Sequence, residues 1–528
     1  MNKTNKKLIY FLLFFIFLIF LKIDFRFADG IFCCSDDFDY YIHAETIVED
    51  FDLDYSNQLK NLEDKRFYKN NISAPIGFFG SGLLSSPFLF VGDLFDSYLF
   101  QPTNNFMNYK LLIYSVSSIF YFLLTIYLLI KTLEILEIKF NPTHLVIFFS
   151  GSGVIYYVFE RYSMTHIYES FTSALIIFFS AKFYKSSKKY SKYSLFIPFA
   201  IMLGLMVKWV NLYLLVIPQI IKYITKSKRS LFRFRNFYIS SSISVVIFLI
   251  HSKLIYGKYT IDPRYVYLPE SGQDLNIFTG STGKNIFIEY FQNFLNILFT
   301  QEFGLLYFSP ILFFALAFLV YIFLNNLRKL KFDKLSFLIL LCFSQVFFTV
   351  LLWKSPASAY GFRYLFTLSS ISIICYFYYL NNYHYKFLNS SLLVLSIFSI
   401  FSVLFFETTP ATQLSLEPEI NSFGKLSSYT SRYYLTGYLN SFFYLESYLK
   451  IFTTSFLGVF IFKFLDLTIG KEILNDFLSS YGLPVENSDF QNYLLEINTV
   501  TIDKLIFILL FTCLFVHFLY KNLYHYKN

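Results

Sequence analysis

An acidic cluster follows directly after the first long apolar run of this chain. The segment "FCCSDDFDYYIHAETI" (residues 32–47) holds Asp36 and Asp37 side by side, followed by Tyr40 and His43. If the segment is helical, Asp36, Tyr40 and His43 share one face at i, i+4 and i+7 spacing. Acids in a first turn also suit the helix dipole, so simple capping is one interpretation. The other is chemical: Asp36 binds a divalent cation such as Mg²⁺ or Mn²⁺, or one carboxylate raises the pKa of its neighbour and makes it a base.

A second group of ionisable residues lies in "VFERYSMTHIYESF" (158–171), where two predicted membrane spans meet. Glu160, Arg161, His166 and Glu169 stand at or just inside the predicted outer boundary, and the first three are the stronger candidates for contacts with a substrate. Ionisable groups at membrane depth are costly and commonly mark functional sites. Glu160 and Arg161 could equally form an exposed ion pair within the turn. Both interpretations remain open, and we include all three residues among the candidate substrate contacts.

Isolated cations form a third group. Lys208 interrupts the apolar run "GLMVKWVNLY", Arg264 follows Pro263, and Arg363 lies in "YGFRYLF". Each one alone is typical of an anchor whose charge reaches the interface. Because positive charge is otherwise scarce on the predicted outer side, several cations at the mouths of spans indicate an anion there. A phosphate at the level of the lipid headgroups is the natural ligand.

The elements that position these residues are predicted to be membrane helices. The chain has 528 residues, of which 55% are hydrophobic and 15% charged, whereas soluble domains carry about 25% charged residues. An apolar run of roughly 20 residues crosses the hydrocarbon layer as a helix. We therefore predict an all-α polytopic membrane protein with about twelve or thirteen crossings. The runs lie at 8–23, 110–130, 144–159, 167–183, 195–224 (two short spans), 237–255, 305–324, 336–352, 363–380, 389–406, 451–467 and 504–520.

The net charge of +9 raises the question of nucleic acid. The Lys and Arg residues, however, concentrate in alternate short connectors, as cytoplasmic loops do under the positive-inside rule. This pattern predicts a lipid bilayer and no nucleic acid as partner. It places the amino terminus inside and residues 29–107, 257–303 and 407–450 outside. The topology of 451–503 stays open, because either 451–467 is an interfacial helix or one predicted span is wrong.

Two regions follow from this organisation. Residues 1–406 form a transmembrane core that includes the external loop 29–107, whose stretch 70–95 is apolar but interrupted by proline and glycine. Such broken apolar backbone is tolerated at the interface or buried against protein. Residues 407–528 form a C-terminal region with one or more external loops and one or two further membrane helices. The basic first segment is expected to be an uncleaved span, because its apolar core is too long for a signal peptide.

Several of these segments resemble, in the same order, parts of the C-type (GT-C) membrane glycosyltransferases. "DDFDYYIHA" is similar to the Asp-Glu-x-x-Tyr-x-x-x-Ala signature of that superfamily, which includes the protein O-mannosyltransferases and the lipid A aminoarabinose transferases. "APIGFFGSGLLSSPFLF" resembles a Pro-rich interfacial helix of uncharacterised bacterial members, and "ERYSMTH" resembles their Ser-Met-x-His turn. "GLLYFSPIL" and "YGFRYLF" resemble their later spans. The resemblance covers residues 8–380.

The resemblance implies a transferase that uses a polyprenyl-phosphate sugar at the outer face of the membrane, with a GT-C-like fold. The first acid of the signature, which acts on the acceptor or binds metal, corresponds to Asp36. The second acid here is Asp37 instead of Glu, and its shorter side chain is not expected to reach the same partner. The acceptor, whether glycan, lipid or protein, is not specified.

Physical chemistry points the same way without the resemblance. A sugar that leaves from phosphate needs one base and cations for the departing charge, in contrast to glycoside hydrolysis with its two carboxylates. A transporter of lipid-linked sugar or polysaccharide, or a polysaccharide polymerase or ligase, are the alternatives. A transporter would place ionisable residues deep in mid-span, and a polymerase or ligase would place its arginines and histidine in a late loop.

Overall fold

The computed structural model of this chain is mainly helical. It describes residues 36–59, 67–99, 109–159, 161–186, 192–262, 264–267, 286–300, 303–351, 360–383 and 385–406, and a few positions between 465 and 476. The predicted spans at 8–23 and 504–520, and almost all of the region 407–528, lie outside the described residues. Within the described part, the only strands form one short hairpin.

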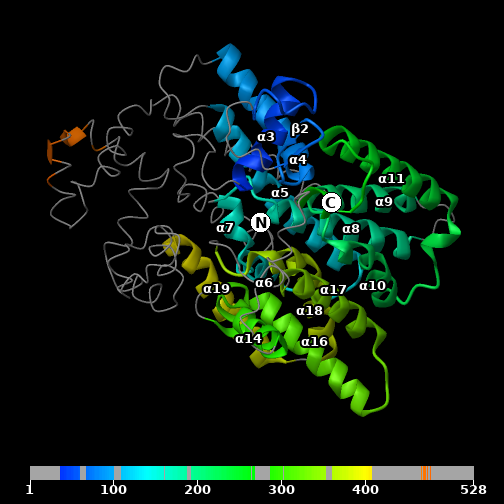
Figure 1. The fold of residues 1–528 in the computed structure, drawn as a ribbon. Coiled ribbons are helices and arrows are strands. Elements are labelled where there is room, and N and C mark those ends of the chain that lie inside the picture. The colour runs from blue at the N-terminus through cyan, green and yellow to red at the C-terminus, as the bar shows by residue number, and fades with distance from the viewer. Residues whose placement is uncertain are drawn as a thin grey trace, which may run out of the picture.

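The described parts of residues 29–107, which the sequence predicts to be a structured external loop, form helices and a hairpin. Helix α3 (Asp36–Glu49) is followed by an antiparallel hairpin of β1 (Phe67–Lys69) and β2 (Ile72–Ala74). Helix α4 (Phe79–Leu94) continues into η1 (Phe95–Leu99). Figure 1 shows α3, β2 and α4 grouped at one end of the molecule.

The glycines that interrupt the apolar stretch 70–95 permit close helix packing. A Cβ on Gly82 would lie 2.4 Å from the Cβ of His43 on α3, and one on Gly80 would lie 2.4 Å from the backbone nitrogen of Val207. Helix α4 therefore packs tightly against α3 and α9, and also against α5. The stretch is helical from residue 79 and is buried against protein on one side, while Phe90 on its other side is 42% exposed.

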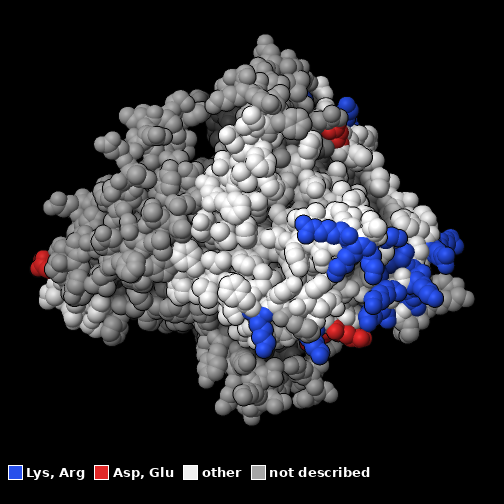
Figure 2. All heavy atoms as spheres, turned by 90° about the horizontal axis from the view of Figure 1, so that it is seen from below, with Lys and Arg blue, Asp and Glu red and all other residues white. Residues whose placement is uncertain are grey.

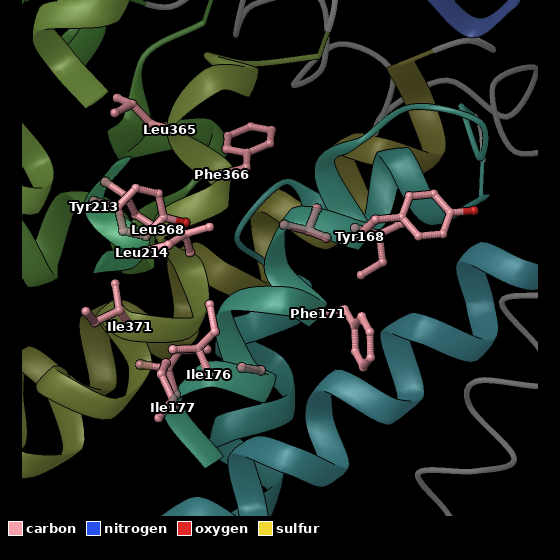
Figure 3. Packing of buried hydrophobic residues seen from close by; sticks show 14 of the residues in the cluster. Tyr168, Phe171, Ile176, Ile177, Tyr213, Leu214, Leu365, Phe366, Leu368 and Ile371 are labelled. Carbon is pink, nitrogen blue, oxygen red and sulfur yellow. The ribbon is translucent and has the colours of Figure 1, made fainter. Parts of the chain in front are cut away.

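Helix α8 (His166–Lys185) lies at the centre of the core. It packs against α5 (Tyr109–Ile135) on one side and against α9 (Tyr193–Val207) and α10 (Ile217–Ile224) on the other. Figure 3 shows Tyr168 and Phe171 on the side of α5, while Ile176 and Ile177 point toward Ile371. The rings of Phe171 and Tyr121 lie 4.8 Å apart between centroids.

Three predicted spans are interrupted instead of continuous. The run 144–159 divides into α6 (Pro142–Ser150) and α7 (Val154–Phe159), because Gly153 adopts a φ of +82° that ends the helix. The run 305–324 divides at Ser309 into α15 (Leu305–Phe308) and α16 (Pro310–Arg328), where Pro310 begins a new helix. The run 363–380 begins as η5 (Arg363–Leu368) before α18 (Ser369–Tyr383).

The run 195–224 forms two helices, as expected from its length. Helix α9 ends at Val207, and Lys208 adopts an extended conformation with ψ 108°. The chain then passes through η2 (Leu212–Leu215) into α10. The interruption places Lys208 and Asn211 in a buried break between two apolar helices.

The remaining elements complete a layer around this core. They are η3 (Leu231–Arg233), α11 (Arg235–Tyr256), α12 (Arg264–Tyr267), α14 (Ile286–Phe299), α17 (Lys334–Leu351) and α19 (Lys386–Phe406). Four helices in the described residues are long and apolar enough to cross a membrane: Ile113–Ile135, Arg235–Tyr256, Pro310–Arg328 and Lys386–Val403. Two shorter apolar helices are Tyr193–Val207 and Lys334–Phe348. The chain thus has the helices of a membrane protein, and the larger number of crossings stays a prediction.

Candidate functional site

The first acid of the cluster, Asp36, binds an arginine that is distant from it in sequence. Asp36 begins α3, where its charge suits the helix dipole. Arg363, at the start of η5, donates from Nη2 to Oδ2 of Asp36 at 3.0 Å. The side chain of Asp36 is 34% exposed and that of Arg363 is 8% exposed. The structure therefore brings together two predicted site residues that are 327 positions apart, and leaves the carboxylate partly accessible.

The second acid has a different environment. Asp37 is fully buried, and Arg161 donates to its Oδ2 from both Nε, at 2.8 Å, and Nη2. Ser163 donates to the other carboxylate oxygen at 3.3 Å. A buried carboxylate needs such compensation for its lost hydration. Asp37 and Arg161 therefore fasten α3 to the turn before α8 and hold the neighbouring Asp36 in place.

A buried glutamate organises the next part of the site. Glu169, in the first turn of α8, accepts hydrogen bonds from Thr165 Oγ1 at 2.7 Å and from Asn211 Nδ2 at 2.7 Å. Lys208 Nζ donates to its Oε1 at 3.1 Å, and His166 Nδ1 lies 3.2 Å from the same oxygen. All of these side chains are buried. The carboxylate thus holds Lys208, in the break between α9 and η2, close to His166 at the start of α8.

The ring of Tyr364 links the two cations. Lys208 Nζ lies 5.3 Å from its centroid, and Arg363 Cζ lies 5.1 Å from it. Arg363 also donates to the Tyr364 hydroxyl at 3.3 Å. The Nε of Arg363 is buried and has no hydrogen-bond partner among the described residues. An amino group, a guanidinium and a phenol ring therefore meet beside Asp36, which is an arrangement suited to an anion.

The hydroxyl of Tyr40 is influenced by the charges of Asp36, Glu169 and Arg363. Burial raises the pKa of Tyr40 well above its usual value, the negative charges of Asp36 and Glu169 add to the rise, and Arg363 opposes it. Tyr40 therefore stays a neutral hydroxyl at physiological pH. We call Asp36, Asp37, Tyr40, Arg161, His166, Glu169, Lys208, Asn211, Arg363 and Tyr364 the site cluster.

His43 faces a separate set of partners. Its Nε2 donates to the carbonyl of Gly77 at 2.8 Å, so its Nδ1 accepts from the hydroxyl of Tyr55 at 2.7 Å. Burial lowers the pKa of His43 to about 3. With both ring nitrogens engaged, this neutral histidine holds the start of α4 against α3. It shares helix α3 with Asp36 and Tyr40, as predicted, but its contacts are structural.

Two predicted residues have no described side-chain position. Glu160 lies outside the described residues, and Arg264 begins α12 with its side chain outside them. The backbone of α12 is nevertheless placed beside the hairpin, because Lys69 Nζ donates to the carbonyl of Tyr265 at 2.8 Å. Their roles as substrate contacts stay predictions.

Two members of the site cluster, Asn211 and Tyr364, are absent from the residues singled out by sequence, whereas Glu169 was noted at the predicted boundary. Asn211 is a polar residue within the apolar run 195–224, and its proximity to Lys208 in sequence is the signal that could have identified it. Tyr364 adjoins Arg363, but it is one of 45 tyrosines in the chain, so its type alone carries no information.

The two carboxylates considered as ligands of a divalent cation, Asp36 and Asp37, already have partners. Oδ2 of Asp36 faces a guanidinium, and Asp37 is occupied by Arg161 and Ser163. Among the described residues, no group of three His, Cys, Asp or Glu side chains lies close enough together to hold a metal ion. Metal binding at Asp36 stays a prediction, and we derive no step through a metal.

The chain was compared with protein-family models, with curated proteins and with solved structures, and none of them matches it. The fold therefore defines only a class: a mainly helical protein that has helices able to cross a membrane and, among its other elements, a buried charged cluster. Any function must be argued from that cluster.

Proposed function

We propose that this chain is an integral-membrane inverting glycosyltransferase. It moves a sugar from a polyprenyl-phosphate donor to a glycan, lipid or protein acceptor at the outer face of a bacterial plasma membrane. The observation that carries the proposal is the partly exposed carboxylate of Asp36, held at 3.0 Å by the buried Arg363 beside Tyr364 and Lys208. The reaction needs a base for the acceptor hydroxyl and cations for the departing phosphate, and an acid next to two cations supplies both.

The cations would act on the donor. As the acceptor oxygen forms its bond to C1 of the sugar, the bond between C1 and the phosphate oxygen breaks, and negative charge grows on the phosphate. Arg363 and Lys208 are the groups to stabilise that charge, because among the described residues Nε of Arg363 has no hydrogen-bond partner and Nζ of Lys208 donates one hydrogen bond, to Glu169. Polyprenyl phosphate leaves as a stable anion, so no general acid is required.

Asp36 would act on the acceptor. It takes the proton of the acceptor hydroxyl, and a positioned base contributes roughly 10²–10⁴-fold to the rate. A guanidinium beside a carboxylate makes that carboxylate a weaker base. If Arg363 turns toward the donor phosphate, its hold on Asp36 weakens, so that donor binding raises the basicity of Asp36. Tyr40, which stays protonated, can donate a hydrogen bond to the sugar or phosphate.

Replacement of the carboxylate tests this mechanism. Membranes that contain Asp36→Asn and a labelled polyprenyl-phosphate sugar are expected to show transfer reduced by at least roughly 10²-fold. Asp52→Asn is the matched control, because Asp52 lies on the same loop, is exposed, and accepts its hydrogen bond from the backbone of Asp54. Transfer by Asp36→Asn at the rate of the control would remove Asp36 from the mechanism.

One observation favours a second function, the transport of a lipid-linked sugar or polysaccharide. Transporters commonly place buried ionisable residues at interruptions of apolar helices, and Lys208 and Glu169 meet at the break after α9. Proteoliposomes distinguish the two functions. A transferase converts the labelled donor to free polyprenyl phosphate, whereas a transporter moves it between leaflets without breaking the sugar–phosphate bond. The polymerase or ligase alternative depends on the loop 407–450, which lies outside the described residues.

A further inference from the structure

A basic loop joins α10 to α11, far in sequence from the site cluster. Residues 222–235, here called the basic loop, contain no Asp or Glu. Its six cations are Lys222, Lys226, Lys228, Arg229, Arg233 and Arg235. Among the described residues, no ion pair joins a carboxylate to any of them. Figure 2 shows one face of the molecule, on which Lys and Arg side chains gather at the side where α10 and α11 lie. Few acidic side chains lie among them.

The basic loop is held in a defined conformation on the core. Arg229 Nη1 donates to the carbonyl of Phe183 at 3.4 Å, and Ser227 Oγ donates to the carbonyl of Tyr184 at 3.4 Å. The ring of Phe234 packs on that of Phe183 with centroids 5.0 Å apart. Because these contacts fasten the loop to the end of α8, its outward cations form a preorganised surface and not a loose basic tail.

The position of the basic loop places that surface at a membrane boundary. Helix α11, one of the four helices able to cross a membrane, begins at Arg235, and only 33% of its apolar window is buried inside the protein. Phe232 is 67% exposed and Tyr238, one turn into α11, is 53% exposed. The Tyr238 hydroxyl donates to the carbonyl of Phe232 at 2.9 Å. Exposed aromatic rings next to cations at the end of a span are typical of the headgroup layer.

We propose that the basic loop is a binding surface for anionic phospholipid headgroups. The phosphates would lie among Lys226, Lys228 and Arg233, which are exposed, while Phe232 enters the outer part of the acyl region. A cluster of four to eight cations directly beside a membrane helix is the usual form of such a surface. The positive-inside rule explains why the charges lie on this side, but it requires only that they act during insertion. The proposed binding of lipid headgroups requires that these cations also act in the folded protein.

The test measures lipid binding by the full chain. The chain, purified in a mild detergent, is titrated with short-chain phosphatidylglycerol and, separately, with short-chain phosphatidylcholine, and bound lipid is counted by native mass spectrometry. The loop variant is Lys226→Gln, Lys228→Gln and Arg233→Gln together. The matched control is Arg328→Gln, Lys329→Gln and Lys331→Gln, which removes three exposed cations from another basic connector.

Each cation near an anionic lipid surface is worth up to about fivefold in affinity. The loop variant should therefore bind phosphatidylglycerol at least roughly tenfold more weakly, and the control variant should bind it like the wild type. Lys226→Arg with Lys228→Arg keeps the charge and should retain binding, which separates loss of charge from loss of folding.

Three results would overturn the proposal. One is equal weakening by the loop and control variants, which would mean that binding follows net charge alone. Another is equal affinity of the wild type for the two lipids. The third is release of phosphatidylglycerol by millimolar inorganic phosphate, which would identify a site for soluble anions. None of these outcomes depends on glycosyl transfer, so the proposed function can fail while this surface stands.

Discussion

The ion pair between Asp37 and Arg161 allows a prediction of stability with a definite size. Asp37 is completely buried and Arg161 is 12% exposed, and the guanidinium provides two of the hydrogen bonds to the carboxylate. Arg161→Met removes both of these hydrogen bonds and leaves the charge of Asp37 buried, with Ser163 still donating to Oδ1. Removal of one member of such a pair typically costs about 3–5 kcal/mol. The exposed pair of Lys185 and Glu137, 35% and 79% exposed, should by contrast contribute about 0–1 kcal/mol.

The measurement is the free energy of unfolding of the full chain in mixed micelles, obtained by titration with a denaturing detergent. Arg161→Met should be destabilised by several kcal/mol, and Lys185→Met should stay close to the wild type. Combining Arg161→Met with Asp37→Leu removes the stranded charge and should recover much of the loss. If Arg161→Met resembles Lys185→Met, or if the double variant is no more stable than Arg161→Met, the pair does not fasten α3 to the core as argued.

Two further perturbations test how α3 and α4 are held together. In the unfolded chain His43 binds a proton below pH 6.5, whereas in the folded chain its pKa is about 3 and it stays neutral. Protonation therefore favours the unfolded chain, and the free energy of unfolding should fall by about 2 kcal/mol between pH 7.5 and pH 5. His43→Gln should remove that part of the pH dependence between pH 7.5 and 5, and an unchanged slope would contradict a buried neutral histidine. Gly80→Ala places a Cβ 2.4 Å from the backbone nitrogen of Val207 and should cost about 1–3 kcal/mol, whereas Leu83→Ala, at a position 37% exposed, should cost less; the same unfolding titration measures both.

The sequence was sufficient for the parts of the fold that depend on local pattern. The apolar runs at 110–130, 237–255 and 389–406 each form one continuous helix, because nothing within them breaks the hydrogen-bond ladder. Asp36 and Asp37 lie in the first described turn of α3, in agreement with the helix predicted for this segment. The breaks at Gly153 and Ser309 were missed, since an apolar run reads the same whether or not a turn divides it.

The candidate site was predictable in its members but not in its pairings. Charge and position indicated Asp36 and Arg363, yet nothing in a sequence shows that residues 327 apart will meet. Arg161 was expected beside a substrate, and its pairing with Asp37 was not foreseen. His43 has the right spacing for the acidic face, but Tyr55 and Gly77 engage both its nitrogens. Such choices are made by tertiary contacts, which a helical period does not encode.

The hairpin of the first loop is attached to a distant segment through one aromatic ring. Lys69 and Lys258 place their amino groups 4.7 Å and 4.8 Å from the centroid of Tyr265, and Lys69 also binds the carbonyl of that residue. These contacts therefore couple the hairpin to the beginning of α12. A force applied to either would be transmitted to the other, so a label on β1 would report displacements of residues nearly two hundred positions later.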